Sequence, residues 1–447
     1  MRTFTRRAGR FASIALFVAS IVTAPLAARA ETREDIERWL TQAAPDPLPV
    51  PGTVLGAGDL PSIASLVLPG YAQYLDYPQL AMSIAATGDY APAAVYQQAT
   101  ATHSSKVSLH PAGGLEGYVA GRPFDPKRLD GATPEEAGLM IAWNHAYRWQ
   151  YYGYEAELDM IYLQPSADGR AVNAVTGMEG GGSVERTLTQ YFHRVYLSHL
   201  AMLPEQGHAV DVGDASPRLY KDYISFTAPF NVKGTTFVVE RAVDVNEEDQ
   251  VSSFLPSERR VRRLSAQERA DKFMGSNFTF DDFEAFSGRV MDYEWIYRGT
   301  KDILHVIDTR EATPRFGGAM SNVPLDEWQV RPCYVVELKP RWTGHTMASK
   351  YLFIDQQTFN GLAALVVDRD DRLARILFPV YHFPEADTST PELALETSVL
   401  RWSGALGIDL LANSSTVTRV VVPTRIPTMT ARAIERKFAV SNLTGGR

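Results

Sequence analysis

The sequence predicts a mainly β protein with some α-helix, built on one large curved antiparallel sheet, or unclosed β-barrel, with covering helices and an irregular N-terminal segment. After Gly182 the chain consists of short stretches rich in β-branched and aromatic residues, such as TTFVVERAVDV and CYVVELK. Neighbouring stretches are often about ten residues apart, which suits hairpins better than helical crossovers. Several stretches also alternate apolar and polar residues, as expected of a sheet with one covered face.

The N-terminus has the features of a secretory signal peptide. An apolar run from Phe11 to about Leu26 follows a basic start formed by Arg2, Arg6, Arg7 and Arg10. The small residues Ala28 and Ala30 predict cleavage after Ala30. The apolar run is shorter than the roughly 20 residues that a membrane span needs. We therefore expect export, and the Arg6–Arg7 pair leaves open whether the general or the twin-arginine route is used.

Charge and cysteine content exclude some classes of protein. The formal net charge is −8, and loss of the five arginines in residues 1–30 would make the mature chain more acidic still. Such a charge argues against nucleic acid as a partner, because non-specific binding to phosphates relies on basic side chains. Cys333 is the only cysteine, so an internal disulfide is excluded and stability must come from a packed core.

Two helices are predicted before the strands. The first has apolar residues at helical spacing in REDIERWLTQA, namely Ile36, Trp39, Leu40 and Ala43. The prolines of PDPLPVPG end it. In TPEEAGLMIAWNHAYRW, Thr133 and Glu136 form a capping box that begins the second. We divide the chain into a signal peptide (1–30), a helix- and loop-rich segment that packs on the sheet (31–130) and a β domain (131–447).

The β domain is predicted to run as antiparallel strands, the first long one being VERTLTQYFHRVYL. Turn sequences VKG, RGTKD, QQTFNG and DRDDR separate the strands, residues 350–383 form three consecutive ones, and ETSVLRW is a late one. In LYKDYISF, one face carries Tyr220, Asp222, Ile224 and Phe226. We expect helices and the N-terminal loops to fill the concave side of the sheet.

The sequence contains few candidates for catalytic or metal-binding motifs. The nine histidines are scattered without a metal-binding spacing, and His145 is best interpreted as structural. The sequence has no G-x-S-x-G motif, and the glycines of GMEGGGSVE do not have phosphate-loop spacing. The pair Asp281–Asp282 could serve a glycosidase, but paired acids are common in an acidic chain. We expect no catalytic residue, no metal and no cofactor.

Aromatic residues make up 11% of the chain and recur in the predicted strands. They could fill a core, or they could line a concave site for an apolar ligand. The sequence leaves both interpretations open.

Several motifs together resemble those of one protein family found in Gram-negative bacteria. The segment SSFLPSERRVRRLSAQERADKFMGSNFTFDDF is similar to a strand with an RRVRR motif followed by an FMGSDFTYEDF-like turn. Upstream GRPFDP with AGLMIAWNHAYRW, and downstream CYVVELKPR with YLFIDQQTF, match further elements. The chain therefore resembles the outer-membrane lipoprotein-sorting-like proteins of the domain of unknown function 1329 family. Two positions depart from the pattern: Asn277 stands where an acid is expected, and Asp125 replaces the second proline of G-x-P-F-P.

The resemblance implies a fold similar to the periplasmic lipoprotein carriers LolA and LolB, with an apolar cavity under helices. It also implies a periplasmic location, with a peripheral position at the outer membrane left open. Implied partners are a hydrophobic molecule or lipid, an inner-membrane efflux-type transporter and an outer-membrane protein.

The predicted ligand-binding residues come from the arginine-rich strand, the aromatic turn after it and the aromatic strands. Arg260 and Arg262 share one side of a strand and could meet an anionic head group, although pairing with acids is the more ordinary role. In FMGSNFTFDDF the aromatic side chains could form a core or line a cavity. The full set is Arg260, Arg262, Phe273, Met274, Phe278, Phe280, Trp295, Tyr297, Tyr223 and Phe226.

The favoured function is a non-enzymatic periplasmic carrier that binds a lipid, acyl chain or sterol-like compound in an apolar cavity and transfers it between the inner and outer membranes. Burial of a twelve-carbon chain would supply roughly 10 kcal/mol of binding free energy without any catalytic group. Two alternatives remain: a hydrolase that uses carboxylates, and a docking factor that binds an efflux-type transporter through an exposed sheet edge.

Overall fold

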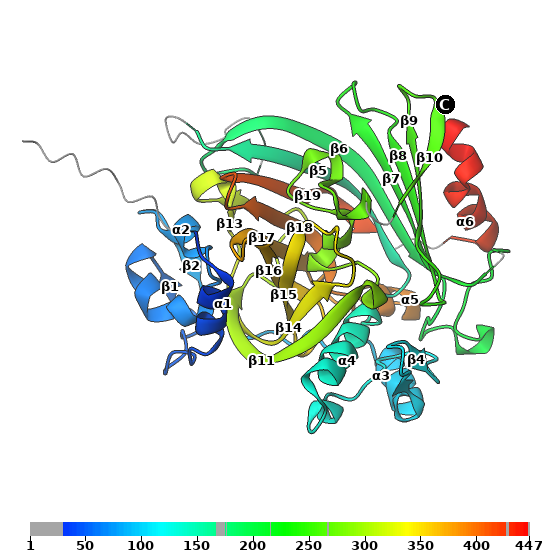
Figure 1. Ribbon diagram of the computed structural model, residues 1–447, viewed down its shortest axis with the longest axis horizontal. Helices are drawn as coiled ribbons and strands as arrows, with labels where there is room; N and C mark the ends of the chain where they lie inside the picture. The colour runs from blue at the N-terminus through cyan, green and yellow to red at the C-terminus, as the bar shows by residue number, and fades with distance from the viewer. Residues whose placement is uncertain are drawn as a thin grey trace, which may run out of the picture. The chain divides into compact units, whose positions relative to one another are not determined.

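The computed structural model describes residues 30–166, 175, 177–214, 216–265, 268–425 and 429–445 (Figure 1). The signal peptide predicted for residues 1–30 lies almost wholly outside these residues and stays a prediction, as do the boundaries of the other two predicted segments. None of the helices in the described part of the chain is long and apolar enough to span a membrane.

One antiparallel sheet of 13 strands dominates the structure and confirms the predicted fold class. Its ends, β10 and β11, each pair on one side only within the described residues, so the sheet is open. In spatial order the strands are β10 (Arg260–Leu264), β9 (Gln250–Leu255), β8 (Thr236–Ala242), β7 (Arg218–Ala228), β6 (Ser183–Tyr196), β5 (Gly153–Gln164), β19 (Ser414–Arg425), β18 (Arg401–Asp409), β17 (Leu373–His382), β16 (Gly361–Asp368), β15 (Met347–Asp355), β14 (Gln329–Pro340) and β11 (Tyr293–His305).

Most neighbours in the sheet follow each other in sequence, as hairpins do. Strands β15, β16 and β17 are the three consecutive antiparallel strands predicted for residues 350–383. Two long-range pairings complete the sheet, β5 with β19 and β11 with β14. The pairing of β5 with β19 places the last strand of the chain beside the first strand of the sheet, so distant parts of the sequence share one wall.

Three strand predictions were wrong. Strand β5 precedes Gly182 and was missed, although its acidic residues alternate with apolar ones as in a half-buried strand. The predicted turn RGTKD lies within β11, where the register shifts between Tyr297 and Thr300 and the chain forms a bulge. The predicted strand ETSVLRW instead contains the end of helix α5 (Pro391–Glu396) and the start of β18.

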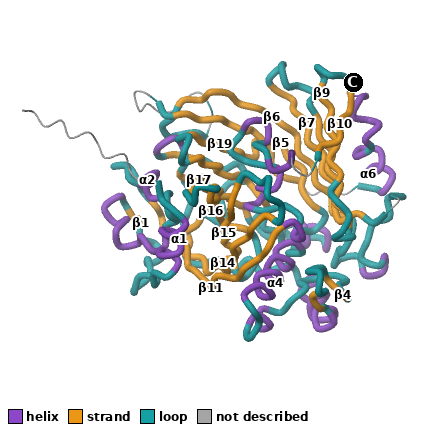
Figure 2. The backbone as a smooth tube through the Cα atoms, in the orientation of Figure 1, coloured by secondary structure: helices purple, strands orange, loops and turns teal. Residues whose placement is uncertain are grey.

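Helices lie around the margins of the sheet (Figure 2). The predicted capping box of Thr133 and Glu136 is present and begins α4 (Pro134–Ala146). A second capping box, which was not predicted, is formed by Thr32 and Asp35 at the start of α1 (Arg33–Leu40). Gly138 allows α4 to lie close against β11, because a Cβ atom there would be 2.8 Å from the Ile296 nitrogen. The other helices are α2 (Ala72–Leu75), α3 (Ala94–His103) and α6 (Ala431–Phe438).

Three two-stranded sheets lie in the connections. They are formed by β1 (Val54–Leu55) with β2 (Met82–Ser83), β3 (Ser108–Leu109) with β4 (Leu115–Glu116), and β12 (Phe316–Gly317) with β13 (Val323–Pro324).

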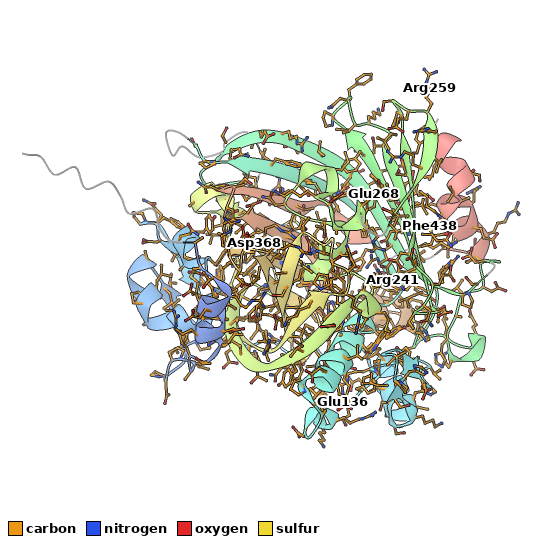
Figure 3. All side chains as sticks on the ribbon, in the orientation of Figure 1. Glu136, Arg241, Arg259, Glu268, Asp368 and Phe438 are labelled. Carbon is orange, nitrogen blue, oxygen red and sulfur yellow. The ribbon has the colours of Figure 1, made fainter. Side chains whose placement is uncertain are left out.

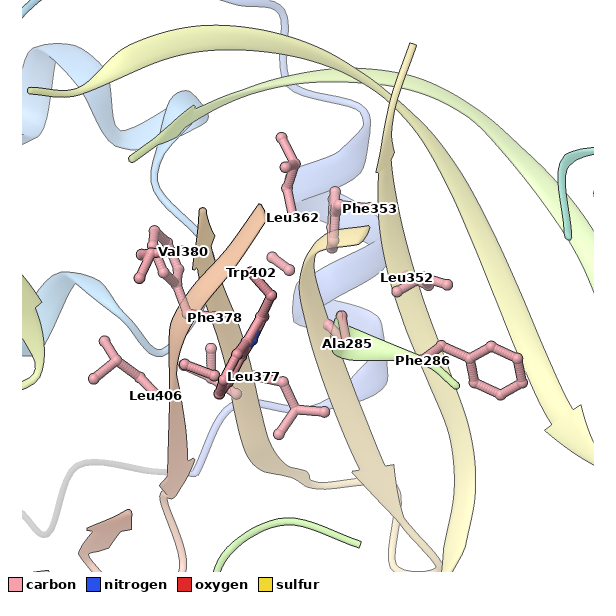
Figure 4. Packing of buried hydrophobic residues seen from close by; sticks show 14 of the residues in the cluster. Ala285, Phe286, Leu352, Phe353, Leu362, Leu377, Phe378, Val380, Trp402 and Leu406 are labelled. Carbon is pink, nitrogen blue, oxygen red and sulfur yellow. The ribbon is translucent and has the colours of Figure 1, made fainter. Parts of the chain in front are cut away.

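The curved sheet surrounds a segment that the sequence did not predict to be there. Residues 268–292, called the plug here, form four short 3-10 turns, η5 (Glu268–Ala270), η6 (Phe273–Gly275), η7 (Phe280–Ala285) and η8 (Val290–Asp292). The plug lies in the middle of the sheet in Figure 1, and its residues Ala285 and Phe286 lie among buried side chains of the sheet in Figure 4. The expectation that helices and N-terminal loops fill the concave side is thus corrected, because much of this role falls to the plug.

Candidate functional site

An apolar cavity of about 100 Å³ lies between the sheet and the plug. Its wall comes from five neighbouring strands, β18, β19, β5, β6 and β7, and its roof comes from the plug. The wall residues are Leu158, Met160, Gln190, Phe192, Arg194, Asp222, Ile224, Trp402, Ala405 and Thr418; the roof residues are Phe273, Phe278, Thr279, Phe280, Asp282, Phe283 and Glu284.

Strand alternation and register bring the wall residues together. Ala405 pairs with Thr418, and Thr418 pairs with Met160 on the next strand. Paired residues in an antiparallel sheet point to the same face, so this row faces the cavity as one line. Gly407 follows on the same strand, and a Cβ atom there would lie 2.8 Å from the Phe278 ring. The glycine therefore leaves room for the plug to approach the wall.

Aromatic contacts hold the plug against the wall. The Phe283 ring lies 5.2 Å from the ring of Phe192 and 5.2 Å from that of Trp402. Phe273 lies 4.6 Å from Phe280 and 5.9 Å from Phe226. Such edge-to-face and tilted ring contacts stabilise the packing beyond what the burial of apolar area contributes.

Asp282 connects the plug to the sheet through a buried ion cluster. Its two carboxylate oxygens lie 2.6 Å from Lys350 Nζ and 2.9 Å from Arg375 Nη1. Burial acts to raise the pKa of the Asp282 carboxyl, but Lys350 and Arg375 outweigh it and hold the pKa well below its usual range. Asp282 is therefore a fixed anion that anchors the plug.

Two more ion pairs link the plug to the sheet and to α4. Arg269 of the plug contacts Asp249, which precedes β9, and donates to Asp281 within the plug at 2.6 Å. Glu284 pairs with Arg148, which follows α4, and accepts a hydrogen bond from Tyr154 at 3.0 Å. The plug thus carries buried acids and one buried base, each with an opposite charge in contact.

The wall holds a buried ion pair of its own. Arg194 donates two hydrogen bonds of 2.7 Å to the carboxylate of Asp222, and its guanidinium carbon lies 5.0 Å from the Phe283 ring centre. Asp222 was correctly placed on the face shared with Ile224 and Phe226, but its partner was not predicted. An acid on the apolar face of a strand was the signal in the sequence that could have indicated a buried ion pair.

The structure brings together only part of the predicted ligand-binding set. Phe273, Phe278 and Phe280 line the cavity, and Phe226 is buried behind Phe273. Met274 is half-buried, and its backbone oxygen accepts hydrogen bonds from Tyr162 and Arg186.

The other predicted residues lie elsewhere. Trp295 is buried near α4 and donates to the Val290 oxygen, while Tyr297 is half-buried beside Tyr334. Tyr223 faces the opposite side of β7 from the cavity and contacts Phe438 of α6. Ligand binding by this set stays a prediction.

The arginine-rich stretch forms the sheet's edge rather than a cavity mouth. Arg259 lies in the β9–β10 turn and projects away from the protein (Figure 3). Arg260 contacts Glu258 at 3.3 Å, and Arg262 contacts Glu268 at 3.5 Å. Both side chains are exposed and neither lines the cavity, which agrees with the pairing role weighed in the sequence.

Histidines and acids do not form a metal centre in the described part of the chain, where no group of three or more His, Cys, Asp or Glu side chains could hold an ion. His145 is buried, and its two ring nitrogens lie 2.8 Å and 2.9 Å from the backbone oxygens of Phe359 and Phe286. Burial, with the nearby Arg148, lowers the pKa of His145 to about 4.

Comparison with known proteins places the chain in a family. The model of the family described as "protein of unknown function (DUF1329)" matches residues 57–444. A DUF1329 protein from Desulfovibrio piger is 19% identical, with a TM-score of 0.45 over 70% of this chain and 100% of that one. A domain from Vibrio parahaemolyticus, described as an outer membrane lipoprotein-sorting protein, is 17% identical, with a TM-score of 0.44 over 69% and 99%.

A LolA superfamily protein from Nitrosomonas europaea is 12% identical, with a TM-score of 0.36 over 67% of this chain and 97% of that one. No curated protein matches the sequence. Since the family model spans most of the chain, this protein belongs to the DUF1329 family.

Proposed function

We propose that this protein is a non-enzymatic periplasmic carrier that holds a hydrophobic molecule between the sheet and the plug for transfer between the inner and outer membranes. The observation that carries the proposal is the apolar cavity between these two parts, roofed by Phe273, Phe278, Phe280 and Phe283. Binding sites for apolar ligands are concave and lined mainly by such side chains. A lipid, an acyl chain or a sterol-like compound would fit this chemistry.

The size of the cavity requires the plug to move when a large ligand binds. An engineered cavity of about 150 Å³ in another protein holds a single benzene molecule, whereas this cavity measures about 100 Å³. An acyl chain therefore needs the space that the plug occupies. Transfer of a twelve-carbon chain from water releases roughly 10 kcal/mol, which would offset part of the free energy needed to displace the plug.

The backbone of the plug favours such a movement. Between described residues, the backbone–backbone hydrogen bonds of residues 268–291 stay within the segment, as from Phe273 to Phe278 and from Ser287 to Asp281. Contacts that involve side chains therefore hold residues 268–291 to the sheet, and at the end of the plug the Asp292 oxygen accepts a hydrogen bond from the backbone nitrogen of Arg341. The plug can move away without breaking the ladder of hydrogen bonds between strands.

The ion pairs disfavour the hydrolase alternative. Each of the three carboxylates at the cavity, Asp222, Asp282 and Glu284, contacts a buried arginine or lysine. A general acid needs a raised pKa, whereas the pKa of Asp282 is lowered.

The experiment is lipid extraction from protein purified from its native periplasm, followed by mass spectrometry. We expect co-purified lipid in the natural protein and little in Ala405→Phe, because the new ring would occupy the cavity. Ala412→Phe, in the exposed turn after β18, is the matched control and should retain lipid. An empty natural protein that also fails to bind fatty-acid and sterol probes would contradict the carrier function.

The partners follow from the proposed route. A carrier between two membranes would receive its load from an inner-membrane efflux-type transporter and deliver it to an outer-membrane protein. Cross-linking in intact cells, with partners identified by mass spectrometry, tests this part, and the absence of any envelope partner would argue against it.

A further inference from the structure

Three buried polar atoms in the wall of the cavity have no partner in the protein. They are Gln190 Oε1, Trp402 Nε1 and Thr418 Oγ1, and no described residue forms a hydrogen bond with any of them. Each of these residues is 5% exposed, and all three line the same cavity. They come from β6, β18 and β19, which the long-range β5–β19 pairing brings together.

Such a cluster is unusual in a folded protein. More than about 90% of buried polar groups have a hydrogen-bond partner, because an unpaired group loses its bonds to water without gaining others. Three such groups around a single apolar cavity are available to form hydrogen bonds with a molecule bound there.

The chemistry of the three atoms limits what that molecule is. The indole nitrogen of Trp402 only donates, the amide oxygen of Gln190 only accepts, and the hydroxyl of Thr418 does both. A hydroxyl group on the ligand can accept from Trp402 and donate to Gln190 or Thr418. A hydrocarbon can do neither.

The charges around the cavity favour a neutral group over an anion. Asp222, Asp282 and Glu284 line the cavity, and among its described lining residues Arg194 is the only cation. Arg194 already forms two hydrogen bonds with Asp222. Each of these three carboxylates is already paired with a buried arginine or lysine. A ligand carboxylate would therefore find no free cation among the described lining residues, and a buried charge without a partner is unfavourable.

We infer that the wall formed by Gln190, Trp402 and Thr418 binds the hydroxyl end of a neutral, largely apolar molecule, such as an alcohol or a sterol-type compound. The inference rests on the proposed carrier function and names its ligand class. The apolar body of the molecule lies against the phenylalanines of the plug. Fatty acids in their ionised form are rejected.

The test compares three eight-carbon probes, 1-octanol, octanoate and n-octane, delivered from cyclodextrin to the full mature protein at pH 7.5. We expect 1-octanol to bind roughly tenfold more tightly than either of the other two, since one or two hydrogen bonds separate them. In Thr418→Val, which replaces the hydroxyl by a methyl group, this preference should fall about fivefold while octane binds as before. Gln190→Met should act in the same way.

Ser415→Ala is the matched control. Ser415 lies on the same strand, is buried and also has an unpaired hydroxyl, but it does not line the cavity. Its removal should leave the preference for 1-octanol unchanged. A direct readout is the ¹⁵N–¹H resonance of the Trp402 indole, assigned with Trp402→Phe, which should shift on addition of 1-octanol and stay in place with octane.

The outcomes separate this inference from the function on which it rests. Equal binding of octane and 1-octanol, or an unchanged preference in Thr418→Val, would mean that the polar atoms bind ordered water only. The inference would then be wrong and the carrier function would stand. Tighter binding of octanoate would also overturn it. If none of the probes binds, both the inference and the carrier function are contradicted.

Discussion

At Asn277 the side-chain amide does what an acid could not. It donates to the backbone oxygens of Gly407 and Ser414 at 3.2 Å and 3.1 Å. A carboxylate at this position, which the resemblance led us to expect, would face these oxygens without a proton to donate. The other departure also has a local role, since Asp125 accepts from the Lys127 nitrogen at the start of a 3-10 turn.

Asn277→Asp should therefore lower the free energy of unfolding by about 3 kcal/mol, because donors are lost and a charge is buried beside carbonyl oxygens. Urea unfolding at pH 7.5 measures the change. Asn231→Asp, in an exposed turn, should change stability by less than about 0.5 kcal/mol. Equal effects at the two positions would contradict the role assigned to Asn277.

A second prediction at the residue scale concerns pH. The His345 ring is buried and accepts a hydrogen bond from the Met347 nitrogen at 3.1 Å. Burial, and then the charge of Lys350, lower the pKa of His345 from 6.5 to about 4, with Asp281 and Asp282 acting in the opposite direction and Arg375 in the same. The unfolded chain therefore binds more protons between these pH values.

Because the folded pKa is the lower one, the protein should lose stability as pH falls below about 6.5, by about 3 kcal/mol at pH 4 from this residue alone. His345→Gln should be less sensitive to pH in urea titrations at pH 7.5 and 4.5. His110→Gln, at an exposed position, should retain the full sensitivity. If His345→Gln loses as much stability between pH 7.5 and pH 4.5 as the natural protein does, other groups cause the pH dependence.

At the scale of an element, the plug depends on its charges. Asp282 is the shared carboxylate partner of two buried cations, Lys350 and Arg375. Removal of one member of a buried ion cluster leaves the others without compensation, which costs about 3–5 kcal/mol. The loss should first affect the plug, since contacts that involve side chains hold residues 268–291.

Asp282→Asn should accordingly increase hydrogen exchange and protease cleavage within residues 268–292 more than in the strands. The control is Lys272→Gln, which removes an ion pair between Asp409 and a side chain that is 48% exposed. Exposed pairs contribute about 1 kcal/mol or less, so this variant should behave as the natural protein does. Uniform loosening of the whole sheet in Asp282→Asn would argue against a separable plug.

At the scale of the whole molecule, the open sheet has edges that must not pair with other chains. Strand β10 is one edge, and its exposed arginines Arg260 and Arg262 hinder the approach of another strand. We therefore expect the arginine-rich stretch to protect this edge of the sheet.

Replacement of both arginines by threonine should increase self-association, seen as dimers or larger species in sedimentation velocity, without a change in 1-octanol binding. Replacement of Arg38 and Arg372, exposed arginines away from this edge, should not. If the double variant stays monomeric and loses affinity for anionic lipid instead, the head-group role considered from the sequence would be supported.

Much of the fold was predictable because strand and helix patterns are local. The capping residues Thr133 and Glu136 begin a helix whatever the helix packs against, because their hydrogen bonds are local. Failures occurred where tertiary context changes the meaning of a local signal. Gly299, in the predicted turn RGTKD, has a φ of +97° but serves a bulge within β11.

The sequence by itself determined the family motifs, the antiparallel strands and the aromatic turn. Only the tertiary structure decided that this turn is a plug, that its acids meet Lys350 and Arg375, and that Gln190, Trp402 and Thr418 share one cavity. The reason is physical: alternation along a strand reports which side chains share a face, whereas pairing between distant strands decides what those side chains face. The β5–β19 pairing joins residues about 260 positions apart and cannot be recognised from the sequence of either strand alone.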